Sequence, residues 1–135
     1  MIKIRGYFSL ILFTFNIFFL LYYSIQLLVF TDEFTTNNIG FFNHAIAGLA
    51  EIIGIIFFSL AIGLLIILFK GAKNQLPLLF TIFLMQVIIS LNLWRYVFTD
   101  NPGETSINSI VYNAINFSLM SFSMLILMMK LKKIF

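Results

Sequence analysis

Four long apolar runs divide the chain, and 11 of its 13 charged residues lie outside them. The runs cover residues 7–30, 43–69, 76–98 and 107–129. As an α-helix, each run is long enough to cross about 30 Å of hydrocarbon at about 1.5 Å per residue. Strands are disfavoured because a transmembrane barrel needs many short segments of alternating polarity. The pattern therefore predicts an all-α integral membrane four-helix bundle with up-down-up-down topology.

The composition agrees with a bilayer environment. Hydrophobic residues make up 61% of the 135 residues and charged residues 10%, whereas about 25% of a soluble domain is charged. Four spans use most of the chain, so residues 1–135 are expected to form a single transmembrane domain. The absence of cysteine excludes disulfides and thiolate chemistry. The formal charge of +3 does not favour nucleic acid as a partner, because the basic residues flank apolar runs.

Basic residues fall almost entirely on one side of the expected bundle. Of the 8 lysines and arginines, all except Arg95 precede the first span, separate the second from the third, or follow the fourth. Positively charged flanks stay in the cytoplasm. Both termini are therefore expected on the cytoplasmic side of the cell inner (plasma) membrane. The opposite loops contain Asp32, Glu33, Asp100 and Glu104.

Glu51 is the only acidic residue inside an expected span. An ionisable side chain in hydrocarbon costs roughly 2.5–3.5 kcal/mol on insertion scales, so such a residue is a candidate for function. His44 precedes Glu51 by two helical turns and is expected to share its helix face. The two residues therefore place the candidate functional site in the outer part of the second span.

A stripe of small residues runs along the same face of the second span. Steps of four and three residues from Glu51 reach Gly40, Ala47, Gly54 and Ala61. Small residues allow membrane helices to approach closely, and polar groups then find partners across the interface. The stripe predicts a helix-packing seam, with Glu51 directed into the bundle.

Polar side chains of the third and fourth spans are expected at a depth similar to that of Glu51. Counted along each helix from its outer end, Asn92, Asn113 and Asn116 lie about 9–13 Å deep. The inner half of the bundle is mostly Leu, Ile, Phe and Met. The sequence thus predicts a polar pocket that opens to the outer face above a dry inner half. The residues expected to line it are His44, Glu51, Asn92, Arg95, Tyr112, Asn113 and Asn116.

Aromatic residues near the helix ends have a simpler interpretation. Tyr22, Tyr23, Trp94 and Tyr96 lie where a membrane protein places its aromatic belt. Arg95, beside them, can extend its side chain to the lipid headgroups. These residues are therefore expected to anchor the helices in the membrane.

Three functions are compatible with the expected pocket. The favoured one is a non-enzymatic binding or accessory protein that takes a small or lipid-like ligand or a partner helix, with Glu51 packed against an internal partner. The first alternative is a proton-coupled small-molecule transporter or channel subunit that uses a hydrated Glu51. The second is a membrane isomerase-type enzyme with Glu51 and His44 as acid and base. The lipid bilayer is a partner in each case, and a homo-oligomer or a larger membrane complex stays open.

Enzymatic chemistry finds little support in the sequence. No serine or cysteine stands in a recognisable nucleophile motif, and no glycine-rich phosphate cradle is present. His44 and Glu51 together fall short of the three or four donors of a zinc site. An enzyme is therefore not favoured, and neither a catalytic residue, a metal nor a cofactor is expected.

Two short motifs and the four-span layout point to a known family. The second span contains Ala-Gly-Leu-Ala-Glu-Ile-Ile-Gly at residues 47–54, and Arg95 precedes Asp-Asn-Pro-Gly at residues 100–103. In these features the chain resembles the small four-span DoxX-like membrane protein superfamily. The family's usual basic residue shortly after the first span is replaced here by Asp32 and Glu33. The resemblance implies a four-helix bundle and, for most relatives, no established reaction.

Overall fold

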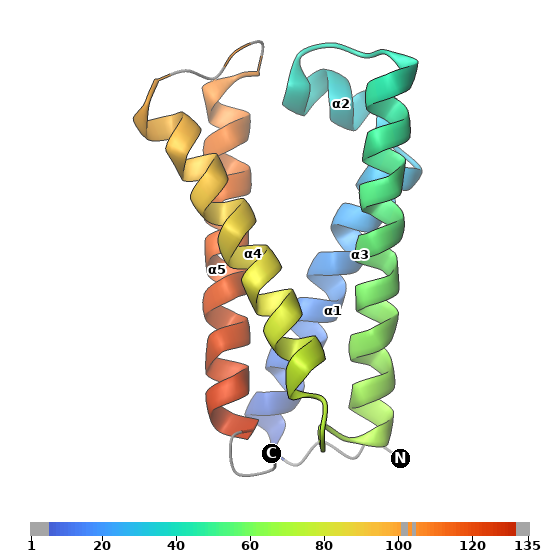
Figure 1. Cartoon of the computed structure of the whole chain (residues 1–135), viewed down its shortest axis with the longest axis vertical. Coiled ribbons are helices and arrows are strands. Elements are labelled where there is room, and N and C mark those ends of the chain that lie inside the picture. The colour runs from blue at the N-terminus through green and yellow to red at the C-terminus, as the bar shows by residue number, and fades with distance from the viewer. Residues whose placement is uncertain (1–5, 101–102, 104, 132–135) are drawn as a thin grey trace.

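The computed structural model describes residues 6–100, 103 and 105–131, and all regular structure within these residues is helical. Four helices are long and apolar enough to cross a membrane. A short fifth helix, α2, connects the first two of them (Figure 1). The helices are α1 (Tyr7–Leu28), α2 (Thr31–Ile39), α3 (His44–Lys70), α4 (Leu76–Phe98) and α5 (Ile107–Leu131). The four long helices end within two residues of the expected spans, so the prediction of an all-α four-helix bundle is confirmed.

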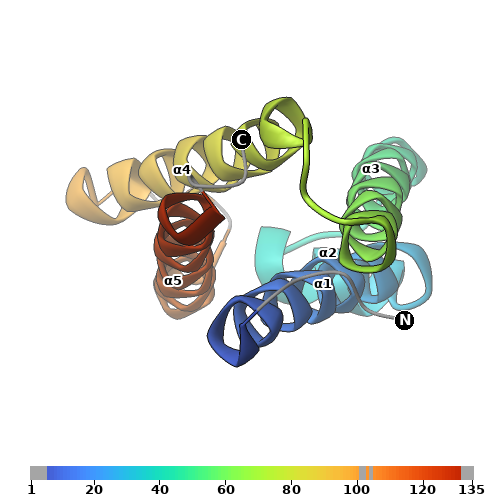
Figure 2. The same cartoon turned by 90° about the horizontal axis from the view of Figure 1, so that it is seen from below.

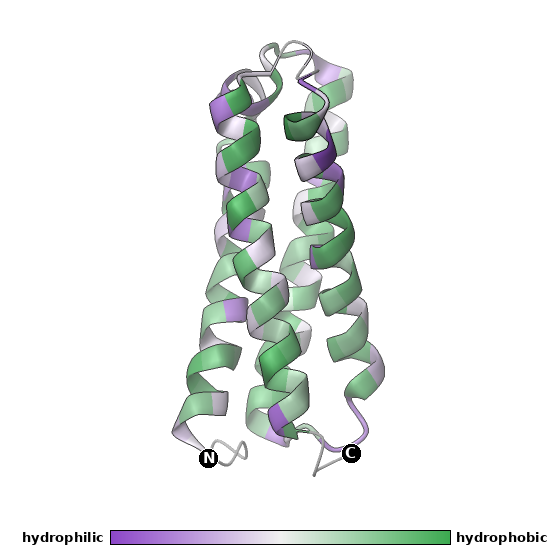
Figure 3. Ribbon diagram, turned by 90° about the vertical axis from the view of Figure 1, so that its left-hand side faces the viewer, coloured by the Kyte–Doolittle hydropathy of each residue, from purple (hydrophilic) through white to green (hydrophobic). Residues whose placement is uncertain are grey.

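The first turn of α1 and the last turn of α5 lie at the same end of the bundle. There the ammonium of Lys130 lies 5.9 Å from the ring centroid of Phe8. We call this the termini end, and we call the opposite end, where α2 lies, the α2 end (Figure 1). Hydrophilic residues gather toward the α2 end of the helices, whereas the termini half is largely hydrophobic (Figure 3). Which of the two ends faces the cytoplasm stays a prediction from the lysine and arginine distribution.

The bundle consists of two antiparallel helix pairs. Helix α1 packs along α3, and α4 packs along α5, while the α1–α5 contact joins the pairs (Figure 2). Helices α3 and α4 approach each other near the termini end, where a Cβ built on Gly63 would lie 3.1 Å from Leu78 Cδ2. Toward the α2 end, α4 leans away from α3 (Figure 1). The two pairs therefore diverge on the α3–α4 side.

Small residues allow α1 and α3 to pack closely. Ala47, Gly54 and Ala61 are all buried on α3. A Cβ built on Gly54 would lie only 2.8 Å from Leu28 Cγ, and the Ser24 hydroxyl of α1 donates a 3.0 Å hydrogen bond to the Gly54 carbonyl oxygen. The backbones thus approach at a point where only glycine fits, as expected for membrane helices with small interfacial residues.

The structure corrects the expectation that the segment with Asp32 and Glu33 is a loop, because residues 31–39 form α2. Both carboxylates lie in the first turn of α2, where they interact favourably with the helix dipole. Gly40 ends the helix in the left-handed conformation, with φ of 94°, and its amide donates to the carbonyls of Thr35 and Thr36. Gly40 is therefore the cap of α2 and lies outside the packing seam of α3.

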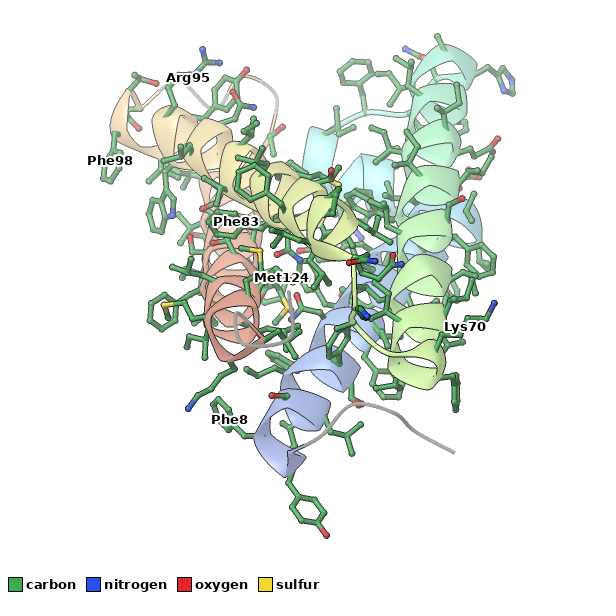
Figure 4. All side chains as sticks on the ribbon, turned by 60° about the horizontal axis from the view of Figure 1, so that its bottom comes forward. Phe8, Lys70, Phe83, Arg95, Phe98 and Met124 are labelled. Carbon is green, nitrogen blue, oxygen red and sulfur yellow. The ribbon has the colours of Figure 1, made fainter. Side chains whose placement is uncertain are left out.

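The core of the termini half is mostly apolar, but it also contains polar side chains. Side chains from all four long helices fill it, including Phe13, Leu64, Leu79 and Met124. Met124 projects from α5 (Figure 4). A buried polar cluster interrupts this core near the middle of the bundle. It consists of Asn16, Gln86 and Ser123.

Candidate ligand cavity between the helix pairs

A cavity of about 330 Å³ lies between the two helix pairs, in the half of the bundle nearer α2. All five helices contribute to its walls. Most of the lining side chains are aliphatic or aromatic, and none is charged. The lining residues are Tyr23, Leu27, Phe34, Asn38, Ile53, Phe57, Ile89, Leu93, Ile110, Asn113 and Phe117.

Aromatic rings surround Tyr23 at one side of the cavity. The Tyr23 ring centroid lies 4.9 Å from that of Phe117, 6.3 Å from that of Phe57 and 6.4 Å from that of Phe34. These rings come from α1, α2, α3 and α5. Edge and tilted contacts of this kind add to the stability that burial provides. The aromatic group therefore fixes the orientation of the Tyr23 side chain at the wall of the cavity.

The only polar side chains of the lining form one hydrogen-bonded chain. Tyr23 Oη donates a 2.5 Å hydrogen bond to Asn113 Oδ1, and Asn113 Nδ2 donates to Asn38 Oδ1 at 2.8 Å. Asn113 Nδ2 also donates to the Ser109 carbonyl, and Asn38 Nδ2 donates to the Phe34 carbonyl, both at 2.9 Å. The cavity thus has apolar walls and one polar end. We call Tyr23, Asn113 and Asn38 the polar end.

Helix α2 covers the cavity because it is bonded to α5. Besides the Asn38–Asn113 bond, the Ser109 hydroxyl donates to the Asn37 carbonyl at 3.1 Å, and the Thr105 hydroxyl donates to the Ile39 carbonyl at 3.3 Å. These bonds connect the α1–α3 pair with the α4–α5 pair across the α2 end. Access to the cavity from that end is therefore restricted.

The side of the cavity between α3 and α4 is open toward the bilayer. Ile53 on α3 is 45% exposed although it lines the cavity, and α4 contributes Ile89 and Leu93 to the same wall. Ile53 lies 17 residues from Lys70, which corresponds to about 25 Å along the helix. This depth is inside a hydrocarbon layer of about 30 Å that begins near Lys70. The α3–α4 side of the cavity therefore lies at a depth that a hydrocarbon layer beginning near Lys70 would cover.

The structure corrects the expected direction of Glu51, because its side chain is exposed. Helix α3 has 27 residues and is therefore about 40 Å long, which exceeds a hydrocarbon thickness of about 30 Å. Counted from Lys70, Glu51 lies at the outer boundary of that layer. It lines a separate pocket of about 330 Å³ with Asp32 and Glu33 at the start of α2. Glu51 is thus an exposed residue that does not line the cavity.

The period of the stripe explains this difference. Steps of four and three residues correspond to a repeat of 3.5, whereas α-helical neighbours are about 100° apart. The buried face of α3 includes Ala50, Gly54 and Phe57, and Glu51 lies about 60° away from Gly54 around the helix axis. Glu51 and His44 therefore fall outside the packed face, and both are exposed.

The other expected site residues are distributed over separate surfaces. His44, Asn92, Arg95 and Tyr112 are exposed. Arg95 lies at the α2 end of α4, directed away from the bundle (Figure 4), and its guanidinium carbon is 4.7 Å from the ring centroid of Tyr96. The structure therefore does not bring these four residues together in one pocket.

Asn113 and Asn116 are both partly buried, but they face different spaces. Asn113 is at the polar end of the cavity, whereas Asn116 lines a groove along the α1–α5 contact together with Tyr22 and Tyr112. Tyr23 lines both spaces. Of the seven residues expected to share a pocket, Asn113 alone lines the cavity between the helix pairs.

Sequence reasoning missed Tyr23 and Asn38 as members of a site. Tyr23 was interpreted as an aromatic-belt residue, and Asn38 lies in the unexpected helix α2. One signal was present, because Asn16 precedes Tyr23 by seven residues on α1 and both are buried. A polar residue repeated at that spacing indicates a helix face that points into the bundle.

No protein-family model, curated protein or solved structure matches this chain. The four long apolar helices define it as a multi-pass membrane protein. Within the described residues, no group of three or more histidine or acidic side chains is placed to hold a metal ion. Membership of the DoxX-like superfamily stays a prediction.

Proposed function

We propose that the protein is a non-enzymatic membrane binding protein that takes a small lipid-like molecule from the bilayer into the cavity between its helix pairs. The observation that supports this function is the combination of an apolar cavity of about 330 Å³, a polar end and an opening at hydrocarbon depth. The volume is at the lower limit of ligand pockets, which measure roughly 300–1,000 Å³.

The chemistry of the walls suits an amphipathic ligand. An apolar tail lying against Phe57, Leu93 and Phe117 makes van der Waals contacts with the cavity walls. Asn38 and Asn113 already bond to each other and to backbone carbonyls, and their amides keep one N–H and spare acceptor capacity that a polar head can use. A ligand with a polar head and an apolar tail therefore fits both parts of the cavity.

The two alternative functions depend on Glu51, and the geometry favours neither. A proton-coupling carboxyl is expected to lie beside the transported molecule, yet Glu51 lines a separate surface pocket with Asp32 and Glu33. An isomerase needs an acid and a base at one substrate, whereas His44 and Glu51 are exposed at positions about 10 Å apart along α3. Binding is the function that makes use of the cavity.

Photo-crosslinking in nanodiscs tests the binding function. The probe is a long alkyl chain that carries a diazirine and a small uncharged head. Leu93→Trp fills the cavity and is expected to reduce crosslinking to cavity-lining peptides several-fold. Leu91→Trp is the matched control, because Leu91 on the same helix is 64% exposed and directed away from the cavity. Equal crosslinking in both variants, or label found only on lipid-facing peptides, would contradict the proposal.

A second pair of variants on the opposite wall repeats the test. Ile53→Trp narrows the opening on α3, and Ile52→Trp changes the neighbouring exposed position. Ile53→Trp alone is expected to lower the crosslinking yield. Because the two pairs lie on different helices, a local folding defect cannot explain the same result in both.

A further inference from the structure

Resting on the proposed function, we propose that the ligand is an uncharged lipid whose head carries a hydroxyl group, and that this hydroxyl binds at the polar end formed by Tyr23, Asn113 and Asn38. The inference follows from the hydrogen bonds that these side chains already make and from those that they leave unmade.

The polar end has almost no donors to spare. The Tyr23 hydroxyl hydrogen is used by Asn113, and both hydrogens of Asn113 Nδ2 are used, by Asn38 and by the Ser109 carbonyl. Asn38 Nδ2 has two hydrogens, of which one is used by the Phe34 carbonyl. One N–H of Asn38 is the single donor left for a ligand.

Acceptors, in contrast, are in excess. The oxygen of Tyr23 keeps acceptor capacity after its hydrogen is donated. Asn113 Oδ1 receives one hydrogen bond, from Tyr23, and Asn38 Oδ1 receives one, from Asn113, while each carbonyl oxygen can accept two. A complementary head must therefore donate at least one hydrogen bond. A hydroxyl donates one and also accepts one, which suits the remaining N–H of Asn38.

Charge excludes the other common lipid heads. No charged side chain lines the cavity, and an ionised group without a partner is expensive to bury. A carboxylate or phosphodiester would also place acceptor oxygens against the acceptors of Tyr23 and Asn113. An ester or ether accepts hydrogen bonds but donates none, so it pairs only with Asn38. Hydroxyl-bearing neutral lipids, such as long-chain alcohols and acylglycerols with a free hydroxyl, remain as the matching class.

The placement of the polar end also sets the orientation of the ligand. Asn38 belongs to α2, so the hydroxyl lies beside α2, and the tail extends along the lining residues of α3 and α4. The ligand therefore enters from the leaflet at the α2 end, with its head near the depth of the headgroups. This orientation avoids moving the hydroxyl across the hydrocarbon layer.

Two probes test whether the protein recognises a hydroxyl on the ligand. Both carry the same diazirine-bearing alkyl chain, but one ends in a hydroxyl and the other in a methyl ether. One hydrogen bond corresponds to about a three- to tenfold difference in affinity, and the full-length protein in nanodiscs is expected to prefer the hydroxyl probe by that factor. Equal crosslinking of both probes inside the cavity overturns the hydroxyl inference and leaves the binding function intact. Failure of both probes to label the cavity overturns the binding function itself.

Asn113→Leu tests the polar end directly. This variant is expected to lower the ratio of hydroxyl to ether crosslinking toward one, whereas a general loss of packing would reduce both yields and leave their ratio unchanged. Asn108→Leu is the matched control on the same helix, because Asn108 is exposed and does not line the cavity. A ratio that is unchanged in Asn113→Leu would overturn the assignment of the polar end.

Discussion

Gln86 Nε2 donates a 3.1 Å hydrogen bond to Asn16 Oδ1, and both side chains are fully buried. The bond connects α4 of one helix pair with α1 of the other. Asn16 Nδ2 in turn donates to Ser123 Oγ on α5 and to the Leu12 carbonyl, both at 2.9 Å. Asn16 and Gln86 lie about 14–15 Å from the termini ends of their helices, near the middle of the bilayer. The two helix pairs are thus clamped below the cavity by this cluster and above it by α2.

We expect Asn16→Leu to destabilise the bundle by about 1–3 kcal/mol, because Gln86 then keeps a buried donor without a partner. Reversible unfolding in mixed detergent and dodecyl sulfate micelles measures the change. Asn92→Leu is the control on α4, since Asn92 is exposed, and it is expected to change the unfolding free energy little. A stability of Asn16→Leu equal to that of the control would show that the clamp contributes nothing.

A double variant that combines Asn16→Leu with Gln86→Leu distinguishes the free energy of the hydrogen bond from the cost of leaving one partner unpaired. Replacing both partners removes the unsatisfied donor, so the double variant is expected to lose less stability than the sum of the two single losses. Gln86 Oε1 has no partner among the described residues, so removing it relieves a further unpaired group. Strictly additive losses would contradict a direct bond between the two side chains.

Two glycines of α3 give opposite predictions. Gly54→Ala places a methyl group 2.8 Å from Leu28 Cγ, so α1 and α3 must separate. Overpacking of this kind costs about 1–3 kcal/mol. Gly48→Ala meets no atom within 4 Å and gains helix propensity of about 1 kcal/mol. The same unfolding assay is expected to rank Gly48→Ala at or above the wild type and Gly54→Ala below it. The reverse order would refute the close approach of the helices at Gly54.

Trp94 reports on the contact between α4 and α5. Its Nε1 donates to Ser118 Oγ at 2.9 Å, and the same hydroxyl lies 2.7 Å from Ser90 Oγ. In Ser118→Ala the indole N–H loses its partner, so the indole hydrogen-bond band in ultraviolet resonance Raman spectra is expected to shift to the position of a free N–H. The chain has a single tryptophan, so the band has one source. Ser121→Ala, which removes only a hydroxyl bonded to the Ser118 carbonyl, is expected to leave the band in place.

The four long helices were predictable because hydropathy alone determines them. Runs such as residues 43–69 have no stable alternative to a helix in lipid. Helix α2 was not predictable from hydropathy, since residues 31–39 are mostly polar. Its local signals were nevertheless present, with Asp32 and Glu33 in the first turn and Gly40 at the end. The same residues are equally typical of a polar loop that flanks a span. The hydrogen bonds between α5 and α2 favour the helix.

The candidate site was harder to predict because it depends on how the helix pairs diverge. A depth count placed Asn92, Asn113 and Asn116 at one level, but it contained no information on which direction each side chain faces. Only Asn113 points between the pairs, where α1 and α2 supply Tyr23 and Asn38. The role of Tyr23 requires the packing of rings from three other helices, which no single span reveals.

The exposure of Glu51 leads to a prediction about thiol labelling. The chain has no cysteine, so Glu51→Cys introduces a single thiol. Because the side chain is exposed at the boundary of the hydrocarbon layer, this thiol is expected to react with a membrane-impermeant maleimide. Ile62→Cys is the control, since Ile62 is exposed in the middle of α3 and faces lipid, where no thiolate forms. An unreactive Glu51→Cys would place Glu51 inside the membrane and restore it as a candidate intramembrane carboxyl.

The same reagent determines the orientation of the bundle when Lys70→Cys is added. Lys70 ends α3 at the termini end, and Glu51 lies near the α2 end, so the two thiols are expected to face opposite sides of the membrane. The lysine and arginine distribution predicts that Glu51→Cys is labelled in intact cells and Lys70→Cys only after permeabilisation. The opposite labelling pattern would place both termini outside. The cavity would then take its ligand from the cytoplasmic leaflet, because its opening lies in the half of the bundle nearer α2.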